Sequence, residues 1–115
     1  MKQNHSGCPV EEVFVQLGGR WKIMILSFLL EEPKRFNEIK KSIPNISQRM
    51  LVLELNFLES KGFIKRTVYS EKPLKVEYSL TEEGQYLDRL ILMCREYGTW
   101  IREREFMRNQ FDQNQ

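Results

Sequence analysis

The segment RFNEIKKSIPNISQRMLVLELNFLESKGFIKRTVYSEKPLKVEYSL, residues 35–80, decides the fold of this 115-residue chain. Its first part places apolar side chains at helical spacing, which predicts a short helix over residues 36–42. The Pro-Asn pair at 44–45 is a turn signal. Ser47 is well placed to cap a second helix that reaches about Ser60, because its hydroxyl can accept a hydrogen bond from a first-turn amide. The segment therefore begins as two helices joined by a short turn.

Two strands are expected after the second helix. Residues 63–69 are β-branched and aromatic, and residues 76–80 alternate apolar with polar side chains. The intervening SEKPLK, residues 70–75, should join them as a hairpin. Helix, turn, helix and basic hairpin in this order predict a winged helix-turn-helix. The fold class is mainly α with a small β-hairpin wing (α+β).

The rest of the chain predicts three more helices and two tails. Proline suits the first turn of a helix, glycine readily ends one, and threonine caps the next. In chain order we expect a flexible tail (1–7), a helix from Cys8-Pro9 to Gly18-Gly19, a helix over 21–30, a long helix that Thr81 caps and that runs to about Arg108, and a flexible tail (109–115). Residues 8–108 should form one domain.

Charge is unevenly distributed along the chain. The formal net charge of +2 is too weak by itself to indicate a nucleic-acid partner. Residues 20–75, however, hold twelve Lys and Arg against six Asp and Glu, whereas residues 77–115 hold five against eight. This pattern indicates a face for a polyanion on one part of the fold. An ordinary mixed surface is the alternative.

Composition excludes several classes of function. No apolar run approaches the roughly twenty residues of a membrane helix, and the N-terminal MKQNHSG lacks the apolar region of a signal peptide. We therefore expect a cytoplasmic protein with no membrane partner. One histidine and two cysteines supply neither a metal-ligand set nor a nucleophile–base pair. We expect no metal, no cofactor and no enzymatic activity.

The outward face of the second helix is predicted to read double-stranded DNA. Leucines at 51, 55 and 58 should face the core, which turns residues 48, 49, 52, 53 and 56 outward. In helix-turn-helix proteins the N-terminal residues of this helix reach base edges in the major groove, while a wing reaches phosphate or the minor groove. The candidate DNA-binding residues are Arg35, Ser47, Gln48, Arg49, Val52, Asn56, Lys72 and Lys75.

The candidates suit particular DNA groups, and some of them also have a simpler explanation as ordinary surface residues. Arginine suits guanine, glutamine or asparagine suits adenine, and Val52 suits a thymine methyl group. Each basic residue could instead be a solvated surface charge. Leu53 either faces DNA or packs partly against the domain.

The last helix is too apolar on one side to be solvated alone, and its second half would overrun the small core. This favours burial against a second copy, together with the first helix, over a helix folded back on its own domain. A twofold dimer would place two reading helices about 34 Å apart on one DNA face. The expected interface residues are Val10, Val13, Phe14, Ile91, Cys94, Trp100 and Ile101.

Cys8 is a candidate redox-sensing residue. It lies at a helix N-terminus, where the positive end of the helix dipole favours the reactive thiolate. The alternative is an inert small residue near the interface. Cys94, within the apolar stripe, is expected to lie in the core rather than to act as a resolving thiol.

Four segments together resemble the HxlR-type family of winged helix-turn-helix regulators, relatives of the MarR type. They are CPVEEVFVQLGGRWKIMIL (8–26), RFNEIKKSIPNISQRML (35–51), LNFLESKGFIKRTVY (55–69) and VEYSLTEEG (76–84), within about residues 8–100. The resemblance implies a bacterial transcriptional regulator, repressor or activator, in which the first and last helices form a homodimer on a palindromic operator. In several members a cysteine at the position of Cys8 senses oxidants or electrophiles, so an oxidant or small-molecule signal is also implied.

One stretch departs from the family pattern. Where family members usually carry polar or basic residues, this chain has Val52, Leu53 and Glu54. We therefore expect few direct contacts to bases, with more of the specificity coming from the wing or from DNA shape.

The alternative function is a winged-helix module for protein interaction without specific DNA binding. Val52 and Leu53 favour this alternative mildly, and the basic residues around 34–41 oppose it.

Overall fold

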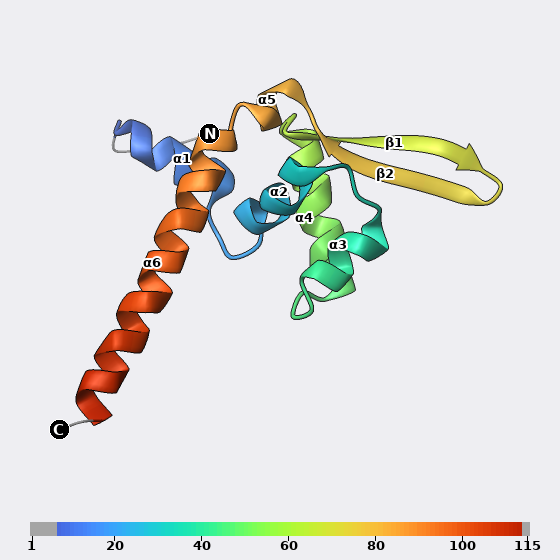
Figure 1. Cartoon of the computed structure of the whole chain (residues 1–115). Helices are drawn as coiled ribbons and strands as arrows, with labels where there is room; N and C mark the ends of the chain where they lie inside the picture. The colour runs from blue at the N-terminus through green and yellow to red at the C-terminus, as the bar shows by residue number, and fades with distance from the viewer. Residues whose placement is uncertain (1–6, 114–115) are drawn as a thin grey trace.

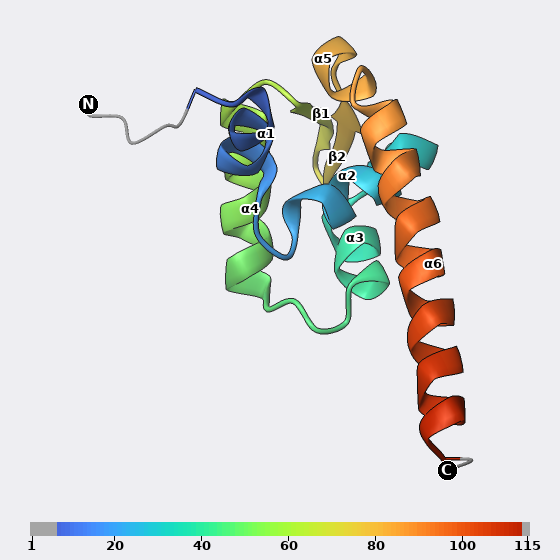
Figure 2. The ribbon, with the colours of Figure 1, turned by 90° about the vertical axis from the view of Figure 1, so that its left-hand side faces the viewer.

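A computed structural model describes residues 7–113 (Figures 1 and 2). Over this range the chain is mainly helical with one two-stranded antiparallel sheet. The predicted winged helix-turn-helix fold is confirmed. The elements, in chain order, are α1 (Pro9–Leu17), α2 (Lys22–Glu31), α3 (Phe36–Ser42), α4 (Gln48–Ser60), β1 (Ile64–Glu71), β2 (Leu74–Leu80), α5 (Glu82–Gln85) and α6 (Asp88–Gln113).

The helix-turn-helix consists of α3 and α4. In the turn between them, the amide of Ile46 donates to the carbonyl of Ile43 over 3.1 Å. Ser47 caps α4 as predicted: its Oγ accepts a hydrogen bond from the amide of Met50 over 3.0 Å. The cap satisfies an amide that has no partner within the helix. The start of α4 is therefore held in one geometry.

The wing is longer than the sequence indicated. The predicted loop over residues 70–75 is wrong in extent, because the two strands continue to pair as far as Glu71 opposite Leu74. An irregularity between Val68 and Ser70 shifts the register and lets the ladder continue. Lys72 lies in the short turn that remains. The hairpin projects from the body of the protein (Figure 1).

One apolar cluster forms the core. Its buried members come from α1, α2, α3, the following turn, α4, β1 and α6, and include the three leucines of α4 that the sequence assigned to it. The members are Leu17, Ile25, Leu26, Leu29, Ile39, Ile43, Ile46, Leu51, Leu55, Leu58, Ile64 and Ile91. Ile91 corrects an expectation: it is fully buried within its own domain and leaves no surface for a partner.

The C-terminal helix begins and ends later than predicted. Thr81 caps the short α5 instead, with its Oγ1 accepting from the amide of Gly84 over 3.0 Å. The long helix starts at Asp88 and continues through Gln113, so the tail expected over 109–115 is helical as far as residue 113. Its second half extends beyond the other elements in both views (Figures 1 and 2). Of the expected N-terminal tail, residues 1–6 lie outside the described residues.

Candidate nucleic-acid interface

The outward face of α4 carries the predicted reading residues. Gln48, Arg49 and Asn56 are exposed, as is Ser47 at the cap. Val52 and Leu53 are also exposed, at 41% and 53%. Leu53 is therefore half-exposed on this face, which combines polar side chains in the first turn with apolar side chains in the second.

Glu54 does not belong to this face. Its Oε1 lies 2.9 Å from the Nζ of Lys22 on α2, and the two side chains are only 12% and 18% exposed. The same ammonium lies 4.7 Å from the centre of the Phe57 ring, one turn further along α4. Helical spacing could have shown this: Glu54 is three residues after the buried Leu51 and adjacent to the buried Leu55, so it borders the core side.

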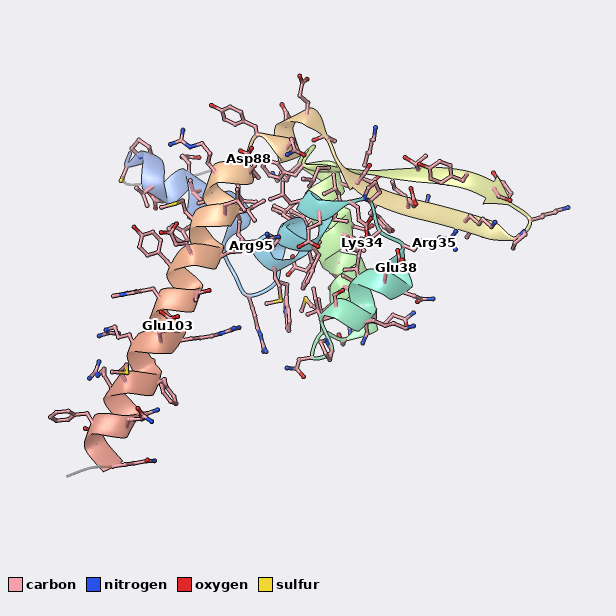
Figure 3. All side chains as sticks on the ribbon, in the orientation of Figure 1. Lys34, Arg35, Glu38, Asp88, Arg95 and Glu103 are labelled. Atoms are coloured by element: carbon pink, nitrogen blue, oxygen red, sulfur yellow. The ribbon has the colours of Figure 1, made fainter. Side chains whose placement is uncertain are left out.

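Arg35 and Lys75 line one cleft between α3 and the wing. The cleft has a volume of about 330 Å³ and is also lined by Phe36, Asn37 and Leu74. Arg35 is the N-cap residue of α3, and its backbone amide donates to the carboxylate of Glu38 over 2.8 Å; both residues are labelled in Figure 3. Two basic residues that are far apart in sequence thus line the same cleft, and basic side chains suit the phosphates of a nucleic-acid backbone.

The wing also contains a tyrosine with a raised pKa, Tyr69, and a lysine at its tip, Lys72. A hydrogen bond with Glu77 raises the pKa of the exposed Tyr69 hydroxyl, and the negative charge of Glu77 adds to the effect. A phenol is protonated at neutral pH with or without this shift, so the Tyr69 hydroxyl is the donor in the bond to Glu77. Lys72 is exposed in the turn at the tip. It does not line the cleft of Arg35 and Lys75.

The predicted interface residues on α1 and α6 are exposed, apart from Ile91. Phe14 is 68% and Trp100 55% exposed, and Val10, Val13 and Ile101 are also on the surface. Cys94 is exposed, which corrects the expectation that it lies in the core. On α6 five exposed apolar or aromatic residues recur at intervals of three, four or seven and form a stripe: Met93, Tyr97, Trp100, Met107 and Phe111. Leu92, Ile101 and Phe106 on the same helix are exposed as well.

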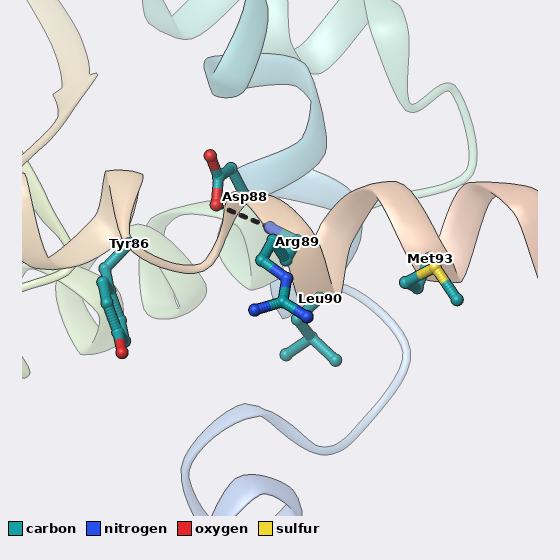
Figure 4. Close-up of a pocket in the computed structure, with 5 residues that line it drawn as sticks. All are labelled: Tyr86, Asp88, Arg89, Leu90 and Met93. Carbon is teal, nitrogen blue, oxygen red and sulfur yellow. Dashed lines mark hydrogen bonds between the residues drawn. The ribbon is translucent and has the colours of Figure 1, made fainter.

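A cleft of about 390 Å³ lies where α5 meets α6 (Figure 4). It is lined by Tyr86, Asp88, Arg89, Leu90 and Met93. The carboxylate of Asp88 accepts a hydrogen bond from the amide of Arg89 over 2.7 Å and so serves the helix start. Met93 belongs to the exposed stripe, so this cleft continues the apolar surface of α6.

Cys8 is exposed at the N-cap position of α1. Its carbonyl accepts a hydrogen bond from the amide of Glu11 over 2.9 Å, so the residue lies directly at the start of the first helical turn. The thiol is thus at the positive end of the helix dipole, as predicted.

Two further properties concern metals and membranes. Within residues 7–113, no three His, Cys, Asp or Glu side chains converge in a way that could hold a metal ion. In the same part of the chain no single helix is long and apolar enough to cross a membrane. Only α1 and α2 taken together reach that length and composition, as a pair bent by 82°.

A capped, exposed helix within a helix-turn-helix, flanked by a basic hairpin, defines a winged helix-turn-helix protein that binds DNA. Residues 16–106 match the HxlR-like helix-turn-helix family, and the chain belongs to that family. It is 48% identical over 99 residues to the HTH-type transcriptional regulator YdeP of Bacillus subtilis, covering 86% of this chain and 77% of YdeP. The protein is accordingly a transcriptional regulator by family.

Two solved structures show similar folds. The redox regulator HypR in its oxidised form is 44% identical, with a TM-score of 0.77 over 80% of this chain and 95% of that one. The reduced form of YodB from B. subtilis is 42% identical, with a TM-score of 0.69 over 78% of this chain and 89% of that one. YodB is also known in diamide-treated and quinone-bound forms.

Proposed function

We propose that this protein is a homodimeric, sequence-specific regulator that binds a palindromic operator with one α4 in each half-site. The observation that carries the proposal is the exposure of Gln48 and Arg49 in a first turn that the Ser47 cap holds in place. Side chains at this position of a helix-turn-helix reach base edges in the major groove. The regulatory unit is the single domain over residues 8–108, with α6 continuing beyond it.

The contacts divide by chemistry. Arg49 suits the O6 and N7 of guanine, and Gln48 and Asn56 suit the N6 and N7 of adenine. Val52 is positioned for a thymine methyl group. The cleft of Arg35 and Lys75 would hold a phosphate, and Lys72 would reach the backbone beyond it.

The dimer is proposed to form through α1 and α6. An exposed apolar stripe that continues past the domain core costs free energy in water unless it is covered. A second copy covers it and supplies the twofold axis that a palindrome requires. Val10, Val13, Phe14, Cys94, Trp100 and Ile101 are the proposed contacts.

Cys8 is proposed to make binding sensitive to oxidants or electrophiles. Diamide would take two electrons and two protons from a pair of thiols, leaving a disulfide between Cys8 and a second cysteine, for example the partner's. A quinone would instead accept the thiolate at a ring carbon. The similar HypR is a redox regulator whose oxidised form is known, and YodB is known bound to a quinone; this similarity supports the proposal.

The decisive experiment is a binding titration on DNA from the region upstream of the protein's own gene. Affinity should exceed that for random DNA, and the slope of log K against log salt should be about −0.9 for each phosphate contact. Equal affinity for both DNAs would contradict the proposal. That result would favour a protein-interaction module, for which the exposed Val52 and Leu53 provide an apolar contact.

A further inference from the structure

We infer that Lys22 and Glu54 are positioning residues for DNA recognition: their ion pair sets the orientation of α4, and α2 transmits that orientation to α6. The inference rests on the proposed function, since it concerns how the reading helix is held. Neither residue touches DNA in the proposal. Both act through the helix that does.

The first link joins α2 to α4 at two points. The Nζ of Lys22 lies 2.9 Å from the Oε1 of Glu54 and 4.7 Å from the Phe57 ring centre. Lys61, another turn along, lies 5.6 Å from the same ring. Because one ammonium contacts side chains a turn apart, both rotation and sliding of α4 would break a contact. Low exposure keeps solvent from screening the pair.

Packing alone would hold α4 less strictly. Leu51, Leu55 and Leu58 form the buried face, and burial of apolar area is non-directional. The attraction between the charges of Lys22 and Glu54 weakens as their 2.9 Å separation grows. Glu54 therefore adds a constraint fixed at one point of α4, which keeps Arg49 and Asn56 aimed outward.

The second link joins α2 to α6. The Nε of Arg95 donates to the Oγ of Ser27 over 2.9 Å, and its Nη2 donates to the Ser27 carbonyl over 2.7 Å. The same Nη2 lies 3.3 Å from the Oε2 of Glu31. Arg95 is on α6, beside α2 (Figure 3). Since α6 is the proposed dimer helix, α2 connects the dimer axis to the reading helix.

The test measures specificity, expressed as the ratio of the dissociation constants for random and operator DNA at one salt concentration. Removing a negative charge tightens binding to any DNA, and the ratio cancels that effect. Glu54→Gln and Lys22→Met should each lower the ratio about tenfold, and the double variant should be no worse than either, as expected for two residues in contact. Glu59→Gln, an exposed residue of the same helix, is the matched control and should leave the ratio unchanged.

Charge reversal provides a second measurement. The pair Lys22→Glu with Glu54→Lys should recover at least part of the ratio that either reversal loses alone. Glu54→Asp, which keeps the charge but shortens the side chain, replaces the other variants if they unfold the protein. It should lower the specificity ratio while the thermal unfolding midpoint stays within a few degrees of wild type. An unchanged ratio for Glu54→Asp and Glu54→Gln, or losses that multiply in the double variant, would overturn the inference.

Arg95→Lys tests the second link separately. It should leave affinity for an isolated half-site unchanged and weaken binding to the full palindrome about fivefold or more, because only the relation between two reading helices is altered. If Arg95→Lys bound the full palindrome, as well as the half-site, with the affinity of the wild type, α6 would have no part in the inference. A wild-type protein without any operator preference would instead refute the proposed function itself.

Discussion

Lys34 and Tyr78 exchange two backbone hydrogen bonds, with the amide of each donating to the carbonyl of the other over 2.9 and 2.8 Å. Tyr78 is in β2, and Lys34 comes just before α3. The antiparallel bridge between them pairs a single residue from outside the hairpin with the second strand of the wing. The base of the hairpin is thereby attached to the helix-turn-helix. As a consequence Lys75 faces the same cleft as Arg35.

Ser47→Ala should destabilise the protein by about 1 kcal/mol, because the Met50 amide loses its acceptor. The free energy of unfolding from urea titration measures this effect. Ser47→Thr keeps the hydroxyl and is the control, with a loss well below that of alanine. Equal stability of Ser47→Ala and wild type would show that the cap contributes nothing.

Arg49→Ala and Lys75→Ala should differ in kind. If Arg49 contacts a base edge, its removal should cost roughly 1–3 kcal/mol of operator binding and relax specificity at one base pair. Removal of Lys75 should weaken operator and random DNA alike and reduce the salt slope by about 0.9. Binding curves for single-base operator variants, measured at several salt concentrations, separate the two; a uniform loss for Arg49→Ala would place it on phosphate.

Trp100→Ala should weaken the dimer by about 2 kcal/mol or more, since large buried aromatic residues dominate interfaces. Sedimentation equilibrium gives the dissociation constant directly. Tyr69→Ala removes a similarly exposed aromatic residue from the wing and should leave association unchanged. A Trp100 variant that associates as tightly as wild type would place the interface elsewhere.

Cys8→Ser should abolish the effect of diamide on operator affinity, while the untreated variant binds like wild type. Cys94→Ser is the informative companion. If the oxidised product joins Cys8 to the partner's Cys94, both variants lose the response, and non-reducing gels show a cross-linked dimer for the wild type only. A wild-type protein whose affinity does not change with diamide would contradict sensing.

Gly84→Ala should destabilise the domain by about 1–3 kcal/mol, as overpacking does. A Cβ at this buried position would lie 2.0 Å from the carbonyl oxygen of Phe63, so backbone must move. Gly98→Ala in α6 meets nothing within 4 Å and should be neutral or stabilise by up to about 1 kcal/mol. Thermal unfolding of both variants checks the contrast.

Local sequence pattern was sufficient to predict that most of the helices and strands exist, but it predicted their ends less well. The range of α3 and the cap of α4 agree with the prediction because each depends on a few adjacent residues. The end of the first helix differs in detail: Gly19, with φ of +99°, is left-handed, whereas Gly18 is extended. The hairpin was predicted too short, and α6 was predicted to begin and end several residues too early. Strand pairing and helix ends depend on neighbours that local pattern does not show.

The sequence by itself determined the winged helix-turn-helix and the outward face of α4, because helical periodicity separates a buried stripe from an exposed one. Only the tertiary structure decided that Ile91 is core, that Cys94 is on the surface, and that Glu54 pairs with Lys22. These depend on which elements pack against each helix. Periodicity gives the direction of a side chain, but long-range contacts alone decide what it meets there.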